Sequence, residues 1–269
     1  MKKNIVILGG TSGVGKAIAL GFRDDEARLL IIGRSEAKAQ RVSHQAHGKI
    51  DFLIADLTNK NEQRKLIQEI GEKFDHIDAL IDTFGVFPSS AEINIRTNLQ
   101  AHAELIHLFV PLLEKSEQAR VALVTGHFQV LRLGMICSGQ KNTVERGIWE
   151  ITHKTLLMKL ASKELFEKNI MVNSFYPGDV QSDLMSWTKN LTNHSVAVGR
   201  RLSLDERYTG VTGKMFDDKG NEVSLPEKYN LINLSNCIFY EPINLSAFAI
   251  FQQIHKLLDS RVYFLSLNC

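Results

Sequence analysis

The stretch NIVILGGTSGVGKAIAL, residues 4–20, joins an apolar run to a glycine-rich turn and then to a second apolar segment. A short apolar run is typical of a strand buried on both faces, and the apolar residues after the turn recur at helical spacing. Glycine lets the backbone turn tightly, and a helix N-terminus offers free N–H groups to an anion. The stretch therefore predicts a strand, a turn that binds an anion, and a helix.

The same alternation continues along the chain. Further runs rich in Val, Ile and Leu lie at residues 29–32, 50–54, 79–81, 121–124 and 170–175. Segments with helical spacing lie at residues 16–22, 62–74, 99–113 and 148–166. Parallel strands need such crossover helices. The pattern predicts an α/β fold of the Rossmann type, a doubly wound parallel sheet that binds ligands beyond the carboxyl ends of its strands.

We expect residues 1–269 to form a single domain, because 269 residues with 44% apolar content suit one α/β core. After about residue 182 the chain turns polar and the alternation is interrupted. This change predicts a substrate-side flap at about 182–240. An amphipathic segment at 245–258 predicts a last helix that packs back on the sheet.

Composition narrows the class of partner. The 32 basic and 30 acidic residues are interspersed and leave a net charge of +2, which does not suit nucleic acid or an anionic membrane. The first apolar run is too short for a signal peptide or a membrane span. Cys137, Cys237 and Cys269 are odd in number and lack CxxC spacing, so no disulfide framework or metal site is expected. We expect a cytoplasmic protein with a small-molecule substrate.

Several motifs in the correct order resemble the short-chain dehydrogenase/reductase family. The first turn is similar to TGxxxGxG with Leu8 in place of threonine, IADLT contains Asp56, and DTFG takes the place of NNAG. TNLQAHAELI is similar to the helix that carries the family's structural asparagine, and MVNSFYPGDVQSDL matches VNxxxPGxVxT. The resemblance implies a cofactor site made of Gly9, Thr11, Ser12, Gly13, Val14, Gly15, Arg34, Asp56, Leu57, Gly85, Lys154, Pro177 and Gly178.

The end of the second strand bears on the choice of cofactor. It reads IIGRS, with Arg34 where an NAD-dependent enzyme would place an acidic residue for the adenosine ribose. A guanidinium suits the 2′-phosphate of NADP because its planar fork matches phosphate oxygens. The sequence therefore favours NADP(H) over NAD(H).

The family's catalytic residues are only partly present. Aligning the lysine of YxxxK with Lys154 places Glu150 at the tyrosine position, and Asn98 matches the structural asparagine. The serine position falls on Gly126, beside Thr125 as a substitute hydroxyl, or in another register on Cys137 beside Ser138.

A glutamate next to a lysine should have a lowered pKa and be ionised near pH 7, which makes it a poor proton donor. His127 and His153 are the other candidate proton carriers, because imidazole titrates near neutrality.

Two functions stay open at this point. One is an NADP(H)-dependent oxidoreductase of carbonyl or alcohol substrates with altered or weak catalysis. The other is a non-catalytic dinucleotide-binding scaffold or sensor that acts through a protein partner. Residues 212–230 loosely resemble a segment of the retinol-dehydrogenase-like branch, which implies a bulky, lipophilic substrate. The resemblance also implies a homodimer formed through the helices at 99–113 and 148–166. The pocket walls expected for that substrate are Phe175, Met185, Trp187 and Phe216.

Overall fold

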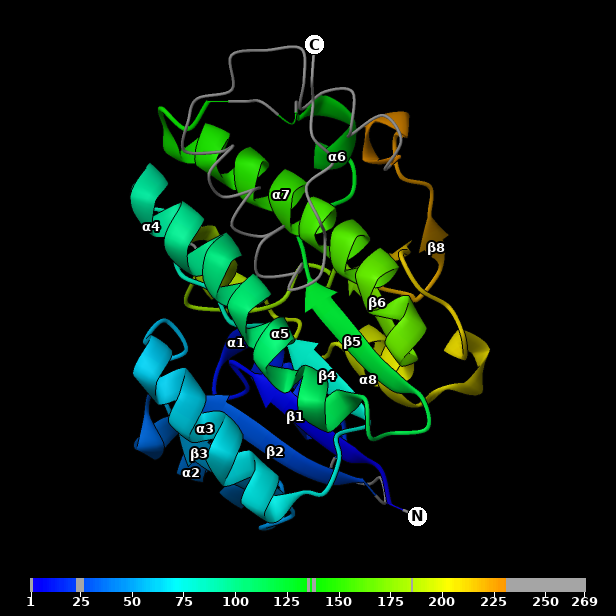
Figure 1. The fold of residues 1–269 in the computed structure, drawn as a ribbon. Coiled ribbons are helices and arrows are strands. Elements are labelled where there is room, and N and C mark those ends of the chain that lie inside the picture. The colour runs from blue at the N-terminus through cyan, green and yellow to red at the C-terminus, as the bar shows by residue number, and fades with distance from the viewer. Residues whose placement is uncertain (1, 23–26, 135, 137–138, 185, 231–269) are drawn as a thin grey trace.

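An eight-stranded sheet lies at the centre of the molecule (Figure 1). The computed structural model describes residues 2–22, 27–134, 136, 139–184 and 186–230. The predicted helix at 245–258 lies outside the described residues, as do Cys137, Ser138, Met185, Cys237 and Cys269.

The strand order is β3-β2-β1-β4-β5-β6-β7-β8, and each neighbouring pair is parallel except β7 with β8. The strands are β1 (Asn4–Leu8), β2 (Arg28–Gly33), β3 (Ile50–Ile54), β4 (Ala79–Asp82), β5 (Ala119–Val124), β6 (Ile170–Phe175), β7 (Met215–Phe216) and β8 (Glu222–Val223). This order confirms the predicted Rossmann-type sheet.

Helices cover both faces of the sheet. The α-helices are α1 (Gly13–Gly21), α2 (Glu36–Gln45), α3 (Lys60–Lys73), α4 (Ala91–Ile95), α5 (Ala101–Leu113), α6 (Val130–Leu133), α7 (Thr143–Glu164) and α8 (Ala197–Leu204). A π-helix, Arg96–Gln100, joins α4 to α5. Short 3₁₀ turns lie at Phe166–Lys168, Ser186–Asn190, Glu206–Tyr208 and Glu227–Tyr229.

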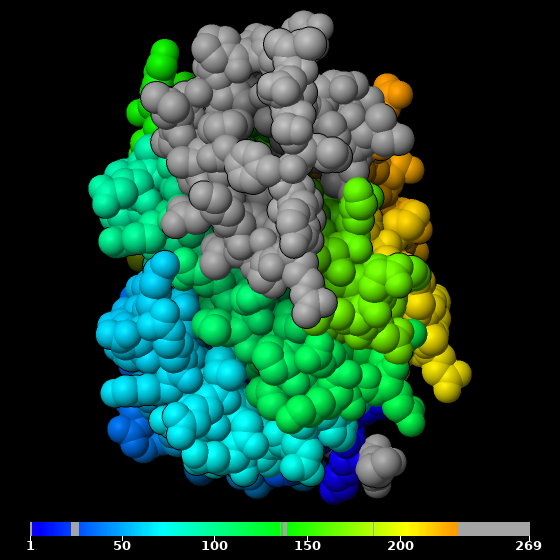
Figure 2. Space-filling view, in the orientation of Figure 1, coloured from blue at the N-terminus to red at the C-terminus, as the bar shows by residue number. Residues whose placement is uncertain are grey.

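The side chains of β1 alternate between the two layers. Val6 and Leu8 pack in a cluster with residues of α3, α5 and α7, whereas Ile5 and Ile7 pack with residues of α1, α2 and α8. In Figure 1, α3, α5 and α7 cross in front of the sheet. Figure 2 shows this layer from outside, with the surface of α3 next to that of α5, and the ion pair of Lys60 with Glu104 at 2.6 Å joins these two helices. Strand β1 is therefore buried on both faces, as its continuous apolar sequence predicts.

Four α-helices of the described chain were not predicted from the sequence: α2, α8 and the short helices α4 and α6. Helix α2 buries only Ala39 and Val42, so its apolar periodicity is weak, although Ser35 caps its N-terminus by accepting from Lys38 N. Helix α8 lies in the polar region for which a flap is expected, yet Val198 and Leu202 belong to the core. Strand β7, in the same region, joins the sheet. Within the described part of residues 182–240, α8 and β7 thus contribute residues to the core.

We find no helix within the described part of the chain that is long and apolar enough to cross a lipid bilayer.

Candidate functional site

A pocket of about 720 Å³ opens at the carboxyl ends of β1 to β4. It is lined by nine residues of the predicted cofactor site, Gly9, Thr11, Ser12, Gly13, Val14, Arg34, Asp56, Leu57 and Gly85. The lining also includes residues that the sequence analysis did not select, among them Lys38, Phe84, Val86, Phe87, Ser182, Asp183 and Leu184. The position agrees with the rule that open parallel sheets bind ligands at this edge.

The turn after β1 has no room for side chains at two of its glycines. Gly9 has a φ of +80°, and a Cβ there would lie 2.8 Å from the backbone of Phe84. A Cβ on Gly15 would lie 2.4 Å from the carbonyl oxygen of Gly9, so Gly15 packs beneath the turn and does not line the pocket. Ser12, at the N-cap of α1, makes no side-chain cap hydrogen bond. The first N–H groups of α1 are therefore left for an anion.

Basic side chains follow β2 at the rim of this pocket. Arg34 is exposed and has no hydrogen bond or ion pair with any described residue. Lys38 Nζ lies 3.9 Å from the carboxylate of Asp183, and both side chains are largely exposed. An exposed pair at this distance is weak, so Lys38 can turn toward another anion.

Asp56 and Leu57 follow β3 at the other side of the pocket. The carboxylate of Asp56 accepts hydrogen bonds from the backbone N–H of Thr58 at 2.9 Å and from its hydroxyl at 2.8 Å. The N–H of Asp56 donates to Glu62 at 2.7 Å. These bonds fix the turn, while Leu57 is buried beneath it.

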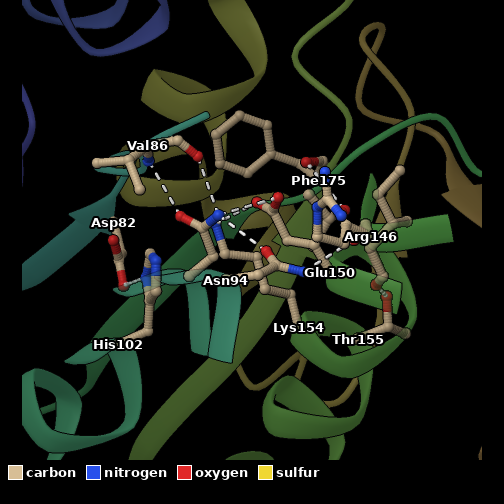
Figure 3. A network of polar contacts seen from close by, with 12 residues as sticks. Asp82, Val86, Asn94, His102, Arg146, Glu150, Lys154, Thr155 and Phe175 are labelled. Atoms are coloured by element: carbon tan, nitrogen blue, oxygen red, sulfur yellow. Dashed lines mark hydrogen bonds and ion pairs between the residues drawn. The ribbon is translucent and has the colours of Figure 1, made fainter. Parts of the chain in front are cut away.

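The structure brings together the three predicted residues Asn98, Glu150 and Lys154 (Figure 3). Lys154 is 5% exposed, and its Nζ lies 3.5 Å from Oε1 of Glu150. The other carboxyl oxygen, Oε2, accepts a hydrogen bond from Nδ2 of Asn98 at 3.3 Å. Glu150 thus contacts both of the other residues, Asn98 and Lys154, that were predicted with it.

Asn98 lies on the π-helix and holds the loop after β4. Its Oδ1 accepts from the N–H of Val86 at 3.0 Å, and its Nδ2 donates to the carbonyl of Val86 at 2.9 Å and to Oδ1 of Asn94 at 3.0 Å. Asn94 is fully buried and donates to Gln140 and to the carbonyl of Arg146. The sequence analysis missed Asn94, although its position four residues before Asn98 was a usable signal.

Burial reverses the expected acidity of Glu150. Its pKa is raised because burial disfavours the carboxylate, and the opposing effect of Lys154 is smaller. The side chain keeps only 19% of its surface exposed. The expectation of a lowered pKa was wrong, because the loss of water on burial outweighs the compensating charge of Lys154.

The predicted site residues directly after β5 and β6 do not line the 720 Å³ pocket; these are Thr125, Gly126, Pro177 and Gly178. Thr125 is buried, and its hydroxyl donates to the carbonyl of Phe175 at 3.4 Å. A Cβ on Gly126 would lie 2.2 Å from Cδ1 of Ile151, so the side chain of Ile151 fills the space that a serine would need. Pro177 and Gly178 follow β6, and Gly178 has a φ of +85°.

Neither candidate histidine is well placed to carry a proton. Burial lowers the pKa of His153 to about 4, although a backbone hydrogen bond raises it slightly. Its Nδ1 lies 2.7 Å from the carbonyl oxygen of Trp149, and its ring stacks on the ring of Trp149. His127 stacks on Phe128 and meets Tyr176 edge-on.

A buried pair of titratable residues was not predicted. Nδ1 of His102 lies 2.7 Å from Oδ2 of Asp82, and both side chains are almost completely buried. Asp82 is the first residue of DTFG, and His102 comes four residues after Asn98. The sequence therefore contained a signal for each residue, an acidic side chain in the motif and a histidine one helical turn after Asn98.

The structure does not place the predicted apolar wall residues around the 720 Å³ pocket. Phe175 and Phe216 belong to the core between the sheet and α1 and α8, so they do not wall a substrate pocket. Trp187 is 63% exposed, and Met185 lies outside the described residues. Phe87 and Leu184 do line the 720 Å³ pocket, and both are large apolar residues with exposed surface.

Known proteins share this fold and parts of this sequence. The model of the short chain dehydrogenase family matches residues 3–131. An uncharacterized oxidoreductase from Staphylococcus saprophyticus is 25% identical over 198 residues, which covers 68% of this chain and 80% of the relative. Carbonyl reductase family member 4 from Xenopus laevis is 26% identical over 208 residues, which covers 74% and 85%.

The fold also matches solved structures. A short chain dehydrogenase from Shigella flexneri complexed with NADP superposes with a TM-score of 0.68 at 18% identity, covering 81% of this chain and 97% of that one. At this identity the match speaks for the fold alone.

Proposed function

We propose that this chain is a short-chain dehydrogenase/reductase that binds NADP(H) and is a weak oxidoreductase of carbonyl or alcohol substrates. Glu150 takes the place of the catalytic tyrosine as proton donor. The observation that carries the proposal is the buried contact of Glu150 with both Lys154 and Asn98, at 3.5 and 3.3 Å.

The pocket fits a dinucleotide. The crowded glycines let the backbone approach a pyrophosphate, and the uncapped start of α1 offers it N–H groups. Asp56 and Leu57 would hold the adenine, and Lys154 the nicotinamide ribose, as the family resemblance implies. When bound, the cofactor supplies or accepts a hydride.

The preference for NADP(H) rests on charge at the end of β2. Arg34 and Lys38 line the same rim of the pocket, and no acidic residue takes the position that would bind an unphosphorylated ribose. A 2′-phosphate carries nearly two negative charges, so two cations there favour NADP(H) over NAD(H).

Glu150 is the best remaining proton donor. A carbonyl that receives a hydride needs a proton, and a carboxyl whose pKa is raised by burial retains one at higher pH than an ordinary glutamate. Thr125 already donates to a backbone carbonyl, and His153 is neutral and donates to Trp149. Catalysis is weak because Gly126 provides no hydroxyl to polarise the substrate.

The second candidate function is a non-catalytic dinucleotide-binding scaffold or sensor. It is favoured by one observation, the side chain of Ile151 in the space that a serine at position 126 would need. In this case Glu150 and Lys154 form a structural ion pair, and the bound dinucleotide is sensed by a protein partner.

The deciding experiment compares wild-type protein with Glu150→Gln. Glutamine keeps the size of the side chain and its contacts with Asn98 but has no acidic proton. We expect both proteins to quench NADPH fluorescence with the same affinity, and Glu150→Gln to oxidise NADPH with ketones or aldehydes at least about 100-fold more slowly. Glu167→Gln, an exposed substitution in the 3₁₀ turn that follows α7, is the control.

Each outcome separates the candidates. Equal turnover by both proteins contradicts the role of Glu150. Binding without turnover in either protein favours the scaffold, and absence of binding contradicts both functions. A Gly126→Ser variant intended to restore a full catalytic set needs Ile151→Ala as well, because the added Cβ overlaps Ile151.

Substrate and assembly follow as secondary proposals. Phe87, Leu184 and Trp187 expose apolar surface, which supports a bulky, lipophilic substrate like those of the retinol-dehydrogenase-like branch. A homodimer through α5 and α7 is supported by the family resemblance.

A further inference from the structure

An aspartate and a histidine form a buried pair next to the loop that follows β4 (Figure 3). Oδ2 of Asp82, at the end of β4, lies 2.7 Å from Nδ1 of His102, in the first turn of α5. Each residue is 1% exposed. Within the described part of the chain, Oδ1 of Asp82 and Nε2 of His102 have no hydrogen-bond partner. Burying such polar atoms is unfavourable, so the pair calls for a role beyond packing.

Asp82 fixes the orientation of the His102 ring. Burial lowers the pKa of His102 and outweighs the opposing effect of Asp82, so the imidazole is neutral and has one N–H to donate. An ionised carboxylate only accepts hydrogen bonds, so this N–H is at Nδ1 and donates to Asp82. A carboxylate that accepts from one ring nitrogen holds both the tautomer and the orientation of the ring.

The oriented ring supports Phe84, a residue of the pocket wall. The rings of His102 and Phe84 are stacked, with centroids 3.9 Å apart and an interplanar angle of 19°. Phe84 is only 9% exposed, yet it lines the 720 Å³ pocket. Stacking against a ring that is itself held by a hydrogen bond restricts the side chain of Phe84 and the backbone that carries it.

The backbone of Phe84 in turn lies against the glycine-rich turn. A Cβ on Gly9 would lie 2.8 Å from both Cα and N of Phe84, so the two backbones are in close contact. The adjacent Thr83 donates from its N–H and its hydroxyl to the carbonyl of Leu8, at 3.0 and 2.7 Å. The N–H of Gly9 donates to the carbonyl of Ile32 at 2.9 Å. A shift of the loop after β4 would therefore move the turn proposed to bind the pyrophosphate.

We propose that Asp82 and His102 are positioning residues for the dinucleotide pocket. His102, held by Asp82, keeps Phe84 in place, and Phe84 keeps the turn at Gly9 in the shape that admits the pyrophosphate. Among the described residues, neither member of the pair lines the 720 Å³ pocket, so both act through Phe84. The effect on dinucleotide affinity rests on the proposed function, whereas the effect on Gly9 belongs to the protein without cofactor.

Two substitutions at position 82 separate the hydrogen bond from the size of the side chain. Asparagine keeps an oxygen that can accept from Nδ1 of His102, and leucine has a similar size without an acceptor. We expect Asp82→Asn to bind NADPH with a Kd within about twofold of the wild-type value. Asp82→Leu should bind NADPH about 10-fold more weakly, because the pocket is no longer preformed. Quenching of NADPH fluorescence measures both values.

Leu113→Ala controls for a general loss of stability. Leu113 is fully buried at the opposite end of α5 from His102, and its truncation leaves a cavity in the core. Urea denaturation should show that this variant is less stable than the wild type, while its Kd for NADPH stays unchanged. Equal weakening of NADPH binding in Leu113→Ala and Asp82→Leu would overturn the proposal.

Hydrogen exchange measured by NMR tests the positioning without cofactor. The N–H of Gly9 should exchange at least about 10-fold faster in Asp82→Leu than in the wild type, because the turn opens more often. Asp82→Asn and Leu113→Ala should keep the wild-type rate at Gly9. An unchanged rate in Asp82→Leu would contradict the proposal.

The two measurements distinguish this inference from the proposed function. If the wild type does not bind NADPH but Gly9 exchanges faster in Asp82→Leu alone, the proposed function fails and the positioning role stands. If the wild type binds NADPH and the two substitutions at position 82 give the same Kd, the positioning role fails and the proposed function stands.

Discussion

At position 150 two opposing effects act on a single carboxyl. The ion pair with Lys154 is long, at 3.5 Å, and Coulomb attraction at that range is about 4 kcal/mol at an effective dielectric constant of 20. Removing a carboxylate from water costs several kcal/mol. Because the two effects are of similar size, the extent of burial decides, and here it raises the pKa.

His153 makes the stability of the protein depend on pH. Its pKa is about 4 in the folded protein against an ordinary value of 6.5. The unfolded chain therefore binds more protons between these values, and stability falls as pH drops from 6.5 to 4. The loss amounts to roughly 3 kcal/mol.

Substituting His153→Phe should remove this part of the pH dependence. The ring still stacks on Trp149, and no group is left to take up a proton. As pH drops from 6.5 to 4, the free energy of unfolding of the variant should fall by roughly 3 kcal/mol less than that of the wild type. Urea denaturation at each pH measures this difference. The exposed substitution His47→Gln is the control. A constant difference between the two proteins across this range would contradict the assignment.

At the scale of elements, the turn from β1 into α1 depends on close backbone packing. Gly15→Ala would place a Cβ 2.4 Å from both the carbonyl of Gly9 and the hydroxyl of Thr83. Relieving this overlap requires backbone movement. We therefore expect the variant protein to be less stable by about 1–3 kcal/mol and to lose NADPH binding.

The same helix provides a matched control for that substitution. A Cβ on Gly21 meets nothing within 4 Å, and Gly21→Ala should be neutral or stabilise by up to about 1 kcal/mol. Thermal denaturation and NADPH fluorescence measure both variants. Equal effects of the two substitutions would show that helix propensity, and not the close approach, sets the stability.

The π-helix between α4 and α5 is the element that assembles the polar network. Asn94 and Asn98 lie four residues apart and are both fully buried, and Asn98 contacts Glu150 across the site. π-helical turns often lie at functional sites. Here the turn places one amide against the loop after β4 and against α7 at the same time.

At the scale of the whole molecule, ligand binding should appear as stability. If NADPH binds the folded chain and not the unfolded chain, a concentration 100 times its Kd adds about 2.7 kcal/mol to the free energy of unfolding. The same concentration raises Tm by several degrees. NADH should raise Tm less, because it lacks the phosphate that Arg34 and Lys38 would bind.

Arg34→Ser tests the source of this preference. Losing one charged hydrogen bond should weaken NADPH binding by about 10- to 100-fold and leave NADH binding unchanged. Arg41→Ser, an exposed position on α2, is the control. A similar loss of affinity for both cofactors would show that Arg34 does not bind the 2′-phosphate.

Much of this architecture could be predicted because strands and turns leave local signals. The six apolar runs became β1 to β6, and the glycine-rich turn lines the 720 Å³ pocket. Helix α8 and strand β7 were missed because they pack on or pair with segments that are distant in the sequence. Strand β8 was missed because it has only two residues, which pair with β7. Only Val198 and Leu202 mark α8 as part of the core.

By itself the sequence determined the fold and the edge of the sheet at which the 720 Å³ pocket lies, and it placed Glu150 where the resemblance implies a tyrosine. The tertiary structure alone decided that Glu150 is buried with a raised pKa, that Ile151 fills the space beside Gly126, and that Asp82 and His102 meet. The physical reason is the distance along the chain over which each property is determined. Backbone periodicity depends on neighbouring residues, whereas desolvation and side-chain overlap depend on segments that only folding brings together.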